Sequence, residues 1–235
     1  MSDASWNVLP HDPLQTLADG LWRVEGSLPR GSLRRVMAVV RMEDGGLLVH
    51  SAIAVDEATL DALLAEGEPT VLIVPNGLHR LDAPAYKARF PQMRVICPEG
   101  ARAAVEKKLP VDGGYRDFEG DGRVSVELLD GVGEAEGFLA VRADDGVTLV
   151  FNDAIFNMPH KAGLEGFIFK HITASSGGPK VSRLGRMLVV KDKHALAAHL
   201  RRLADTPDLR RILVAHHETI EDDPAGVLRR VADAL

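Results

Sequence analysis

The chain has 235 residues, of which 46% are hydrophobic and 26% charged, an ordinary globular composition that excludes collagen-like and fully disordered proteins. Its 28 Lys and Arg against 34 Asp and Glu give a net charge of −6, so no basic excess is present for binding nucleic acid. A single cysteine, Cys97, excludes an intramolecular disulfide and a cysteine-rich zinc module.

The N-terminal segment has neither the basic region nor the apolar stretch of a signal peptide. The apolar runs, such as Thr70–Val74, are far shorter than the roughly 20 residues that span a bilayer. We therefore expect a soluble, cytoplasmic protein without a membrane partner. Because no internal repeat or low-complexity linker interrupts the chain, we also expect a single domain over residues 1–235.

The first half of the chain alternates strand and helix patterns. Strands are predicted at Leu21–Glu25, Arg35–Met42, Leu47–His50, Thr70–Val74 and Arg94–Cys97, and helices at Glu57–Glu66, Ala85–Phe90 and Ala101–Lys108. The turn at Asp44-Gly45 predicts a hairpin between the second and third of these strands. The continuous apolar run at Thr70–Val74 is typical of a strand that is buried on both faces.

The second half repeats this plan. Strands are predicted at Val124–Leu129, Phe138–Arg142, Thr148–Asn152 and Arg211–Ala215, a long loop at Met158–Gly178, and amphipathic helices around Leu196–Leu203 and Val227–Leu235. Each half thus begins with strands and finishes with helix, strand and helix. This repetition predicts an α/β protein with two mixed sheets packed face to face and helices outside.

Polar residues with metal-binding chemistry stand at the ends of several predicted strands. These residues are His79, Asp82, Glu134, Asp153 and His216. Imidazole and carboxylate groups are ligands for zinc, manganese or iron, and α/β proteins bind their ligands at strand ends. Other roles stay open at this point. Asp153 could form a turn, Asp82 could cap a helix, Glu134 could be a solvated turn charge, and only one of the neighbouring His216 and His217 can point inward.

The order of these segments resembles the metallo-β-lactamase superfamily over roughly residues 20–230. The resemblance is carried by Gly46–Ser51, by Pro75–Ala83 after a buried strand, by Gly133–Gly137, by Phe151–Phe156 and by Leu213–His217. In this family, His-x-His-x-Asp-His, Gly-His-Thr-Pro-Gly, a metal-bridging Asp and a last His bind the metals. This chain departs from the motifs, because Asn76 and Leu78 fall on the first two histidine positions and Glu134 replaces another. A shift of one residue would instead place His79 on the second position, so the register of this cluster stays open.

The resemblance implies a four-layer αββα sandwich and a metal-dependent hydrolase with a degenerate site. Asp153 and His79 would carry catalysis, and His79, Asp82, Glu134, Asp153 and His216 would hold one or two ions of zinc, manganese or iron. The carboxylates in that set favour manganese or iron. The alternative is a metal-free pseudo-enzyme of the same fold that binds a small molecule or a protein. We expect a small-molecule substrate, a homodimer, and a loop at 158–178 that covers the site and binds anions through its His and Lys residues.

Overall fold

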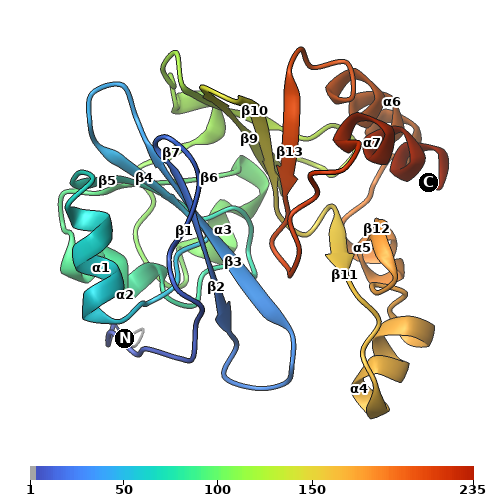
Figure 1. Ribbon diagram of the computed structural model, residues 1–235, viewed down its shortest axis with the longest axis horizontal. Helices are drawn as coiled ribbons and strands as arrows, with labels where there is room; N and C mark the ends of the chain where they lie inside the picture. The colour runs from blue at the N-terminus through green and yellow to red at the C-terminus, as the bar shows by residue number, and fades with distance from the viewer. Residues whose placement is uncertain (1–3) are drawn as a thin grey trace.

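The computed structural model describes residues 4–235 and consists of two main β-sheets with helices on their outer faces (Figure 1). The first sheet has seven strands in chain order: β1 (Gln15–Ala18), β2 (Leu21–Ser27), β3 (Arg34–Arg41), β4 (Leu47–His50), β5 (Pro69–Ile73), β6 (Arg94–Cys97) and β7 (Gly113–Gly114). The second has four strands in the order β13 (Leu209–Leu213), β10 (Gly146–Phe151), β9 (Gly137–Ala143) and β8 (Val124–Leu128).

Both sheets are mixed, as the sequence predicts. In the first sheet, β1 to β4 are antiparallel, whereas β4 to β7 run parallel to one another. In the second sheet, β10 is parallel to β13 and antiparallel to β9. Each sheet therefore contains a parallel pair, β4 with β5 and β10 with β13, whose carboxyl ends can present side chains at one edge.

Alternating side chains explain how the first sheet is buried on both faces. Leu48 and Ile73 point between the sheets and pack with Leu139 and Val150 of the second sheet. The neighbouring Leu72 belongs instead to the outer core. A strand directs successive side chains to opposite faces, so the continuous apolar run at 70–74 serves two cores at once.

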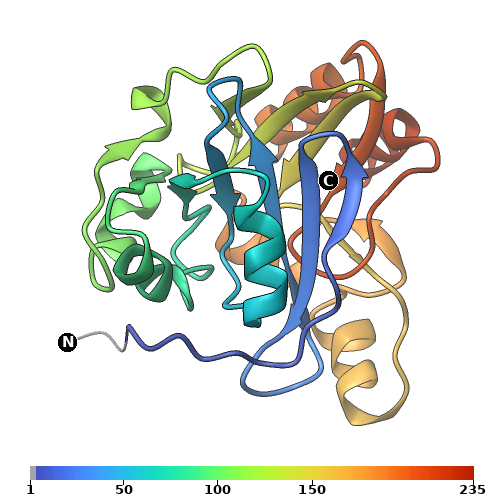
Figure 2. The same ribbon diagram turned by 60° about the vertical axis from the view of Figure 1, so that its left-hand side comes forward.

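The helices complete four layers. The outer face of the first sheet is covered by α1 (Glu57–Leu64), α2 (Ala83–Arg89) and α3 (Arg102–Val105), and that of the second by α6 (Lys193–Leu203) and α7 (Pro224–Asp233). Figure 2 shows the same layers turned by 60°. The predicted four-layer αββα arrangement is thereby confirmed, and strand and helix bounds agree with the predicted ones to within a few residues for most elements.

The segment predicted as a long loop contains helical turns. It includes α4 (Gly163–Phe167) and a π-helical turn at Ile168–Ile172, with a short pair of strands, β11 (Phe156–Met158) and β12 (Gly178–Lys180), at its two ends. A further helix, α5 (Arg183–Leu188), follows it. In Figure 1, α4 projects away from both sheets. Because α4 packs on neither main sheet, its sequence shows little of the apolar periodicity from which a helix is predicted. Within residues 4–235, no helix has the length and hydropathy needed to cross a membrane.

Candidate metal centre

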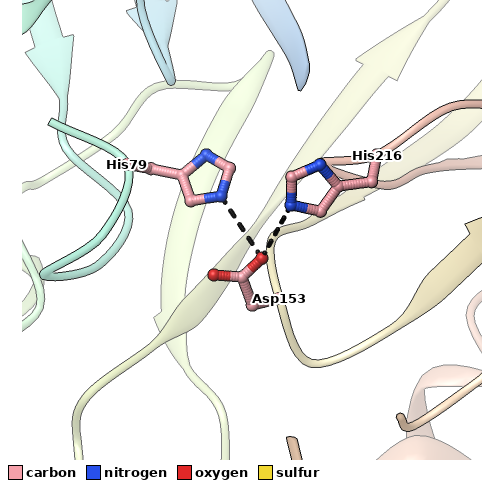
Figure 3. Close-up of side chains that lie close together, drawn as sticks. All are labelled: His79, Asp153 and His216. Atoms are coloured by element: carbon pink, nitrogen blue, oxygen red, sulfur yellow. Dashed lines mark hydrogen bonds and ion pairs between the residues drawn. The ribbon is translucent and has the colours of Figure 1, made fainter. Parts of the chain in front are cut away.

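Three predicted ligands meet at one edge of the two sheets. His79 follows β5, Asp153 follows β10 and His216 follows β13, so the residues come from the carboxyl ends of parallel strands in both sheets. Their ligand atoms all lie within 4.8 Å of one another. The two imidazole rings approach Asp153 from either side (Figure 3). His79 Nε2 lies 3.2 Å and His216 Nε2 3.1 Å from the same oxygen, Asp153 Oδ1.

Asp153 is ionised in this environment. Burial by itself raises the pKa of its carboxyl group, but the charge of His79 and the hydrogen bonds from His216 and His79 outweigh burial and hold the pKa well below its usual range. An ionised carboxylate can only accept hydrogen bonds. The site thus contains a buried negative charge faced by two ring nitrogens.

His216 is positioned through its second ring nitrogen. Its Nδ1 lies 2.6 Å from the backbone carbonyl oxygen of Arg34, which can only accept, so Nδ1 carries a proton. Nε2 must then either carry a second proton, making the ring a cation, or give its lone pair to a cation. Metal-ligating histidines are commonly oriented by such a hydrogen bond to a carbonyl group.

His79 is positioned in a comparable way by Ser51. The Ser51 hydroxyl oxygen lies 3.0 Å from His79 Nδ1. Since a hydroxyl group can both donate and accept, it fits either tautomer of this ring. Ser51 has a φ of 56°, a left-handed conformation that is uncommon outside glycine and is often found at functional sites. The turn after β4 therefore places this hydroxyl against the ring.

Asn76 and Glu136 occupy the other side of Asp153. The Asn76 side-chain amide donates to Asp153 Oδ2 at 2.8 Å and to Glu136 Oε2 at 3.3 Å. Glu136 also accepts a hydrogen bond from the backbone N–H of Ala154 at 2.7 Å. Burial, followed by the nearby charge of Asp153, raises the pKa of Glu136 to about 8. The Asn76 amide group thus bridges the two acidic groups.

Comparisons with solved structures agree with this architecture. A metallo-β-lactamase from Erythrobacter litoralis, crystallised with β-mercaptoethanol in its active site, superposes with a TM-score of 0.61 over 94% of this chain and 96% of its own. A metallo-β-lactamase from Pontibacter korlensis superposes with a TM-score of 0.62 over 94% of this chain and 99% of its own. The chain has the metallo-β-lactamase fold. Sequence identity to each is 12%, which establishes the fold alone. The sequence matches no family model and no curated protein.

Within this metallo-β-lactamase fold, Asp82 lies outside the cluster. Its carboxylate forms a buried ion pair with Arg35, at 2.5 Å, and accepts the backbone N–H of Ala54 at 2.8 Å. Asp82 stands at the N-terminal cap position of α2, yet its side chain makes no capping hydrogen bond. Since the Asp82 carboxylate accepts hydrogen bonds from Arg35 and Ala54, it does not face His79 and His216.

Glu134 also lies elsewhere. Its side chain is exposed and pairs with Arg116 at 2.6 Å, whereas Glu136, two residues later, is the buried glutamate of this segment. Glu134 lies in a turn with a φ of 59°, and Glu136 directly precedes β9. The sequence did not distinguish the two. The choice between the neighbouring histidines is also resolved: His216 faces Asp153, and His217 Nδ1 lies 3.6 Å from Glu25 Oε1.

Sequence reasoning missed Ser51, Glu136 and His50 as neighbours of the site. His50 is 2% exposed, and its Nε2 has no hydrogen-bond partner within residues 4–235. The signal for Ser51 and His50 was their place at the end of a predicted strand, within the segment Gly46–Ser51 that resembles the family. The loop residues His160 and Lys161 do not line the site, since His160 pairs with Ser176 and Lys161 with the carbonyl of Ser32.

Proposed function

We propose that the protein is a hydrolase that uses one divalent metal ion held by His79, Asp153 and His216. The observation that carries this proposal is the convergence of two imidazole Nε2 atoms on one buried carboxylate oxygen. Two nitrogen ligands and one oxygen ligand, with further coordination positions left for water and substrate, are typical of catalytic zinc sites. The donor atoms present therefore fit the ion that the fold implies.

Zinc is the metal that we expect to bind most tightly. Among manganese, iron and zinc, the affinity of a given nitrogen and oxygen site is highest for zinc. The preference for manganese or iron depended on Asp82 and Glu134, whose carboxylates are paired with Arg35 and Arg116 instead. A single ion is favoured over two, because the Asn76 amide already bridges the carboxyl groups of Asp153 and Glu136.

A divalent ion at this site would supply Lewis-acid activation of water and of the scissile carbonyl or phosphoryl oxygen. The chain's own residues orient the groups around it. The Arg34 carbonyl and the Ser51 hydroxyl fix the two rings, and Asp153 provides a negative charge. The substrate is a small molecule bound in the adjoining cavity, which measures about 320 Å³ and is lined in part by all three ligands.

A second candidate is a metal-free binding protein of the same fold. It is favoured by Asn76, whose amide satisfies two carboxyl groups without an ion. In this case, the same cavity would bind a small molecule without converting it. The two candidates differ in whether the protein takes up metal.

Elemental analysis of zinc-reconstituted protein tests the proposal. We expect near-stoichiometric zinc in the wild type and its loss in Asp153→Asn and His216→Ala, since each variant removes one of three ligands. Glu134→Gln is the matched control, because its exposed side chain pairs with Arg116 at the surface, and it should retain the metal.

Two outcomes would redirect the proposal. Zinc retained in both ligand variants, or absent from reconstituted wild type, would contradict the metal site and favour the binding protein. Ester hydrolysis that survives chelation and disappears in Ser51→Ala would instead identify the Ser51 hydroxyl as a nucleophile whose proton passes to His79 Nδ1, 3.0 Å away.

A further inference from the structure

The cavity beside the three ligands is walled mainly by hydrocarbon. Six apolar side chains larger than alanine, from four segments, line it: Leu28, Leu33, Leu78, Leu81, Phe156 and Val189. Phe156 continues this wall to the cluster itself, since its ring stacks on that of His216 with the centroids 5.1 Å apart. A molecule that reaches the cluster therefore lies along apolar surface.

Among the described residues that line the cavity, no Lys or Arg side chain lacks a carboxylate partner. Among its described lining residues, Arg35 is the single Lys or Arg side chain. Its guanidinium group pairs with the buried carboxylate of Asp82 at 2.5 Å. A phosphate or carboxylate group on the distal part of a substrate would lose its hydration without gaining a cation, which is unfavourable. The expected anion-binding residues Lys161 and Lys170 are not among the lining residues.

We propose that the cavity takes the uncharged hydrocarbon chain of an acyl compound, so that the substrates of this site are neutral carboxylic esters with an apolar acyl group. This inference rests on the proposed hydrolase function and adds the substrate class to it. A neutral carboxylic ester is favoured over a phosphodiester as substrate. A phosphodiester carries a negative charge, and the one Lys or Arg side chain in the described lining, Arg35, is already paired with Asp82. In the reaction, water adds its oxygen to the acyl carbon, the bond from that carbon to the alcohol oxygen breaks, and one water proton leaves with the alcohol.

Two exposed leucines at the cavity allow the walls to be changed with little risk to folding. Leu78 is 79% exposed and Leu81 is 46% exposed, and both line the cavity. Leu164 on α4 is 77% exposed but does not line it, which makes this residue a matched control for Leu78.

The first test compares esters of increasing chain length. For the zinc-reconstituted protein, kcat/KM should rise from the p-nitrophenyl esters of acetate to butyrate and hexanoate, by about fourfold per buried methylene group. The mono-p-nitrophenyl ester of adipate matches hexanoate in length but ends in a carboxylate, and its kcat/KM should be at least about tenfold lower. Equal or faster hydrolysis of the adipate ester, or no rise with chain length, would overturn the inference.

The variants locate the preference in the cavity. Leu78→Glu should flatten the rise with chain length, whereas Leu164→Glu should keep it. Leu81→Lys should narrow the difference between the hexanoate and adipate esters, because it supplies the missing cation. If Leu78→Glu and Leu164→Glu behave alike, the hydrocarbon chain does not lie in this cavity.

A binding measurement separates this inference from the proposed hydrolase activity. Hexanamide and adipamate are unreactive analogues of the two acyl groups, and an NMR titration follows each one. Tighter binding of hexanamide, weakened in Leu78→Glu, would support the cavity's preference even if no ester were hydrolysed, in which case the hydrolase proposal alone would fail. Hydrolysis of esters with tighter binding of adipamate would refute the inference and leave the hydrolase proposal standing.

Discussion

His50 is a buried imidazole whose charge state is coupled to the stability of the fold. It ends β4 on the face between the two sheets, where Leu48 also points. Burial, helped by the positive charge of His79, lowers the pKa of His50 from 6.5 to about 3. The ring is therefore neutral in the folded protein at pH 7, and its side chain adds no charge beside the three candidate ligands.

This shift predicts a stability that falls on acidification. Below about pH 6.5 the unfolded chain protonates this histidine, while the folded protein does not do so until about pH 3. His50 should thus reduce the free energy of unfolding by up to about 1.4 kcal/mol per pH unit across that window. Urea unfolding across the window should show a shallower pH dependence in His50→Gln than in the wild type.

The control for this measurement is His194→Gln, which removes an imidazole that is exposed on α6. Other groups that titrate in the window are shared by all three proteins and cancel in the comparison. Identical slopes for the wild type and His50→Gln would contradict the buried, neutral state of His50.

At the scale of the elements, two helices, α1 and α2, each have an aspartate at the N-terminal cap position, but the two side chains bind different partners. Asp56 caps α1, since its side chain accepts the backbone N–H of Thr59 at 2.8 Å. Asp82 precedes α2 without capping it and instead joins α2 to β3 through Arg35. An aspartate at the same helix position thus stabilises the first turn of α1 in one case and the contact between α2 and β3 in the other.

Alanine at each position should separate these roles. Asp56→Ala should lower the free energy of unfolding by about 1 kcal/mol, the usual cost of a lost cap. Asp82→Ala should lower it by about 3–5 kcal/mol, because Arg35 is left buried without its carboxylate. Urea unfolding of both variants measures the difference. Equal decreases in the free energy of unfolding would mean that the buried ion pair stabilises the fold no more than a helix cap does. Loss of zinc from folded Asp82→Ala would show that Asp82 contributes to the metal site.

For the whole molecule, the two sheets share one central core. Leu48 and Ile73 from the first sheet contact the same apolar cluster as Leu139 and Val150 from the second. The candidate metal centre also takes His79 from one sheet and Asp153 and His216 from the other. Neither sheet can separate without exposing this core and dispersing the site.

We therefore expect residues 1–235 to unfold as one unit. Calorimetry should give a single transition whose van't Hoff and calorimetric enthalpies agree. Two resolved transitions would show that the halves fold independently. Light scattering, run on the same samples, tests the predicted homodimer.

The sequence alone determined most strands of the two main sheets, the helices that cover them, and their order. Alternating and continuous apolar runs are local patterns, and they placed β2 to β6, β8 to β10 and the helices α1, α6 and α7 close to their observed bounds. The same patterns showed that His79, Asp153 and His216 stand at strand ends. Segment 158–178 was not predicted as helical, because short helices that pack on little else leave no periodic signal in the sequence.

Only the tertiary structure decided which polar side chains meet. The Asp82 carboxylate forms an ion pair with Arg35, 47 positions away in the sequence. The Asn76 side chain bridges Glu136 and Asp153, which lie 60 and 77 positions from it. Glu134 and Glu136 are equivalent in local pattern but differ in burial. Hydrogen bonds and ion pairs of this kind depend on how distant strands align, and a short sequence window carries no information on that alignment. Apolar periodicity is read locally, whereas the partners of a buried charge are set by the whole fold.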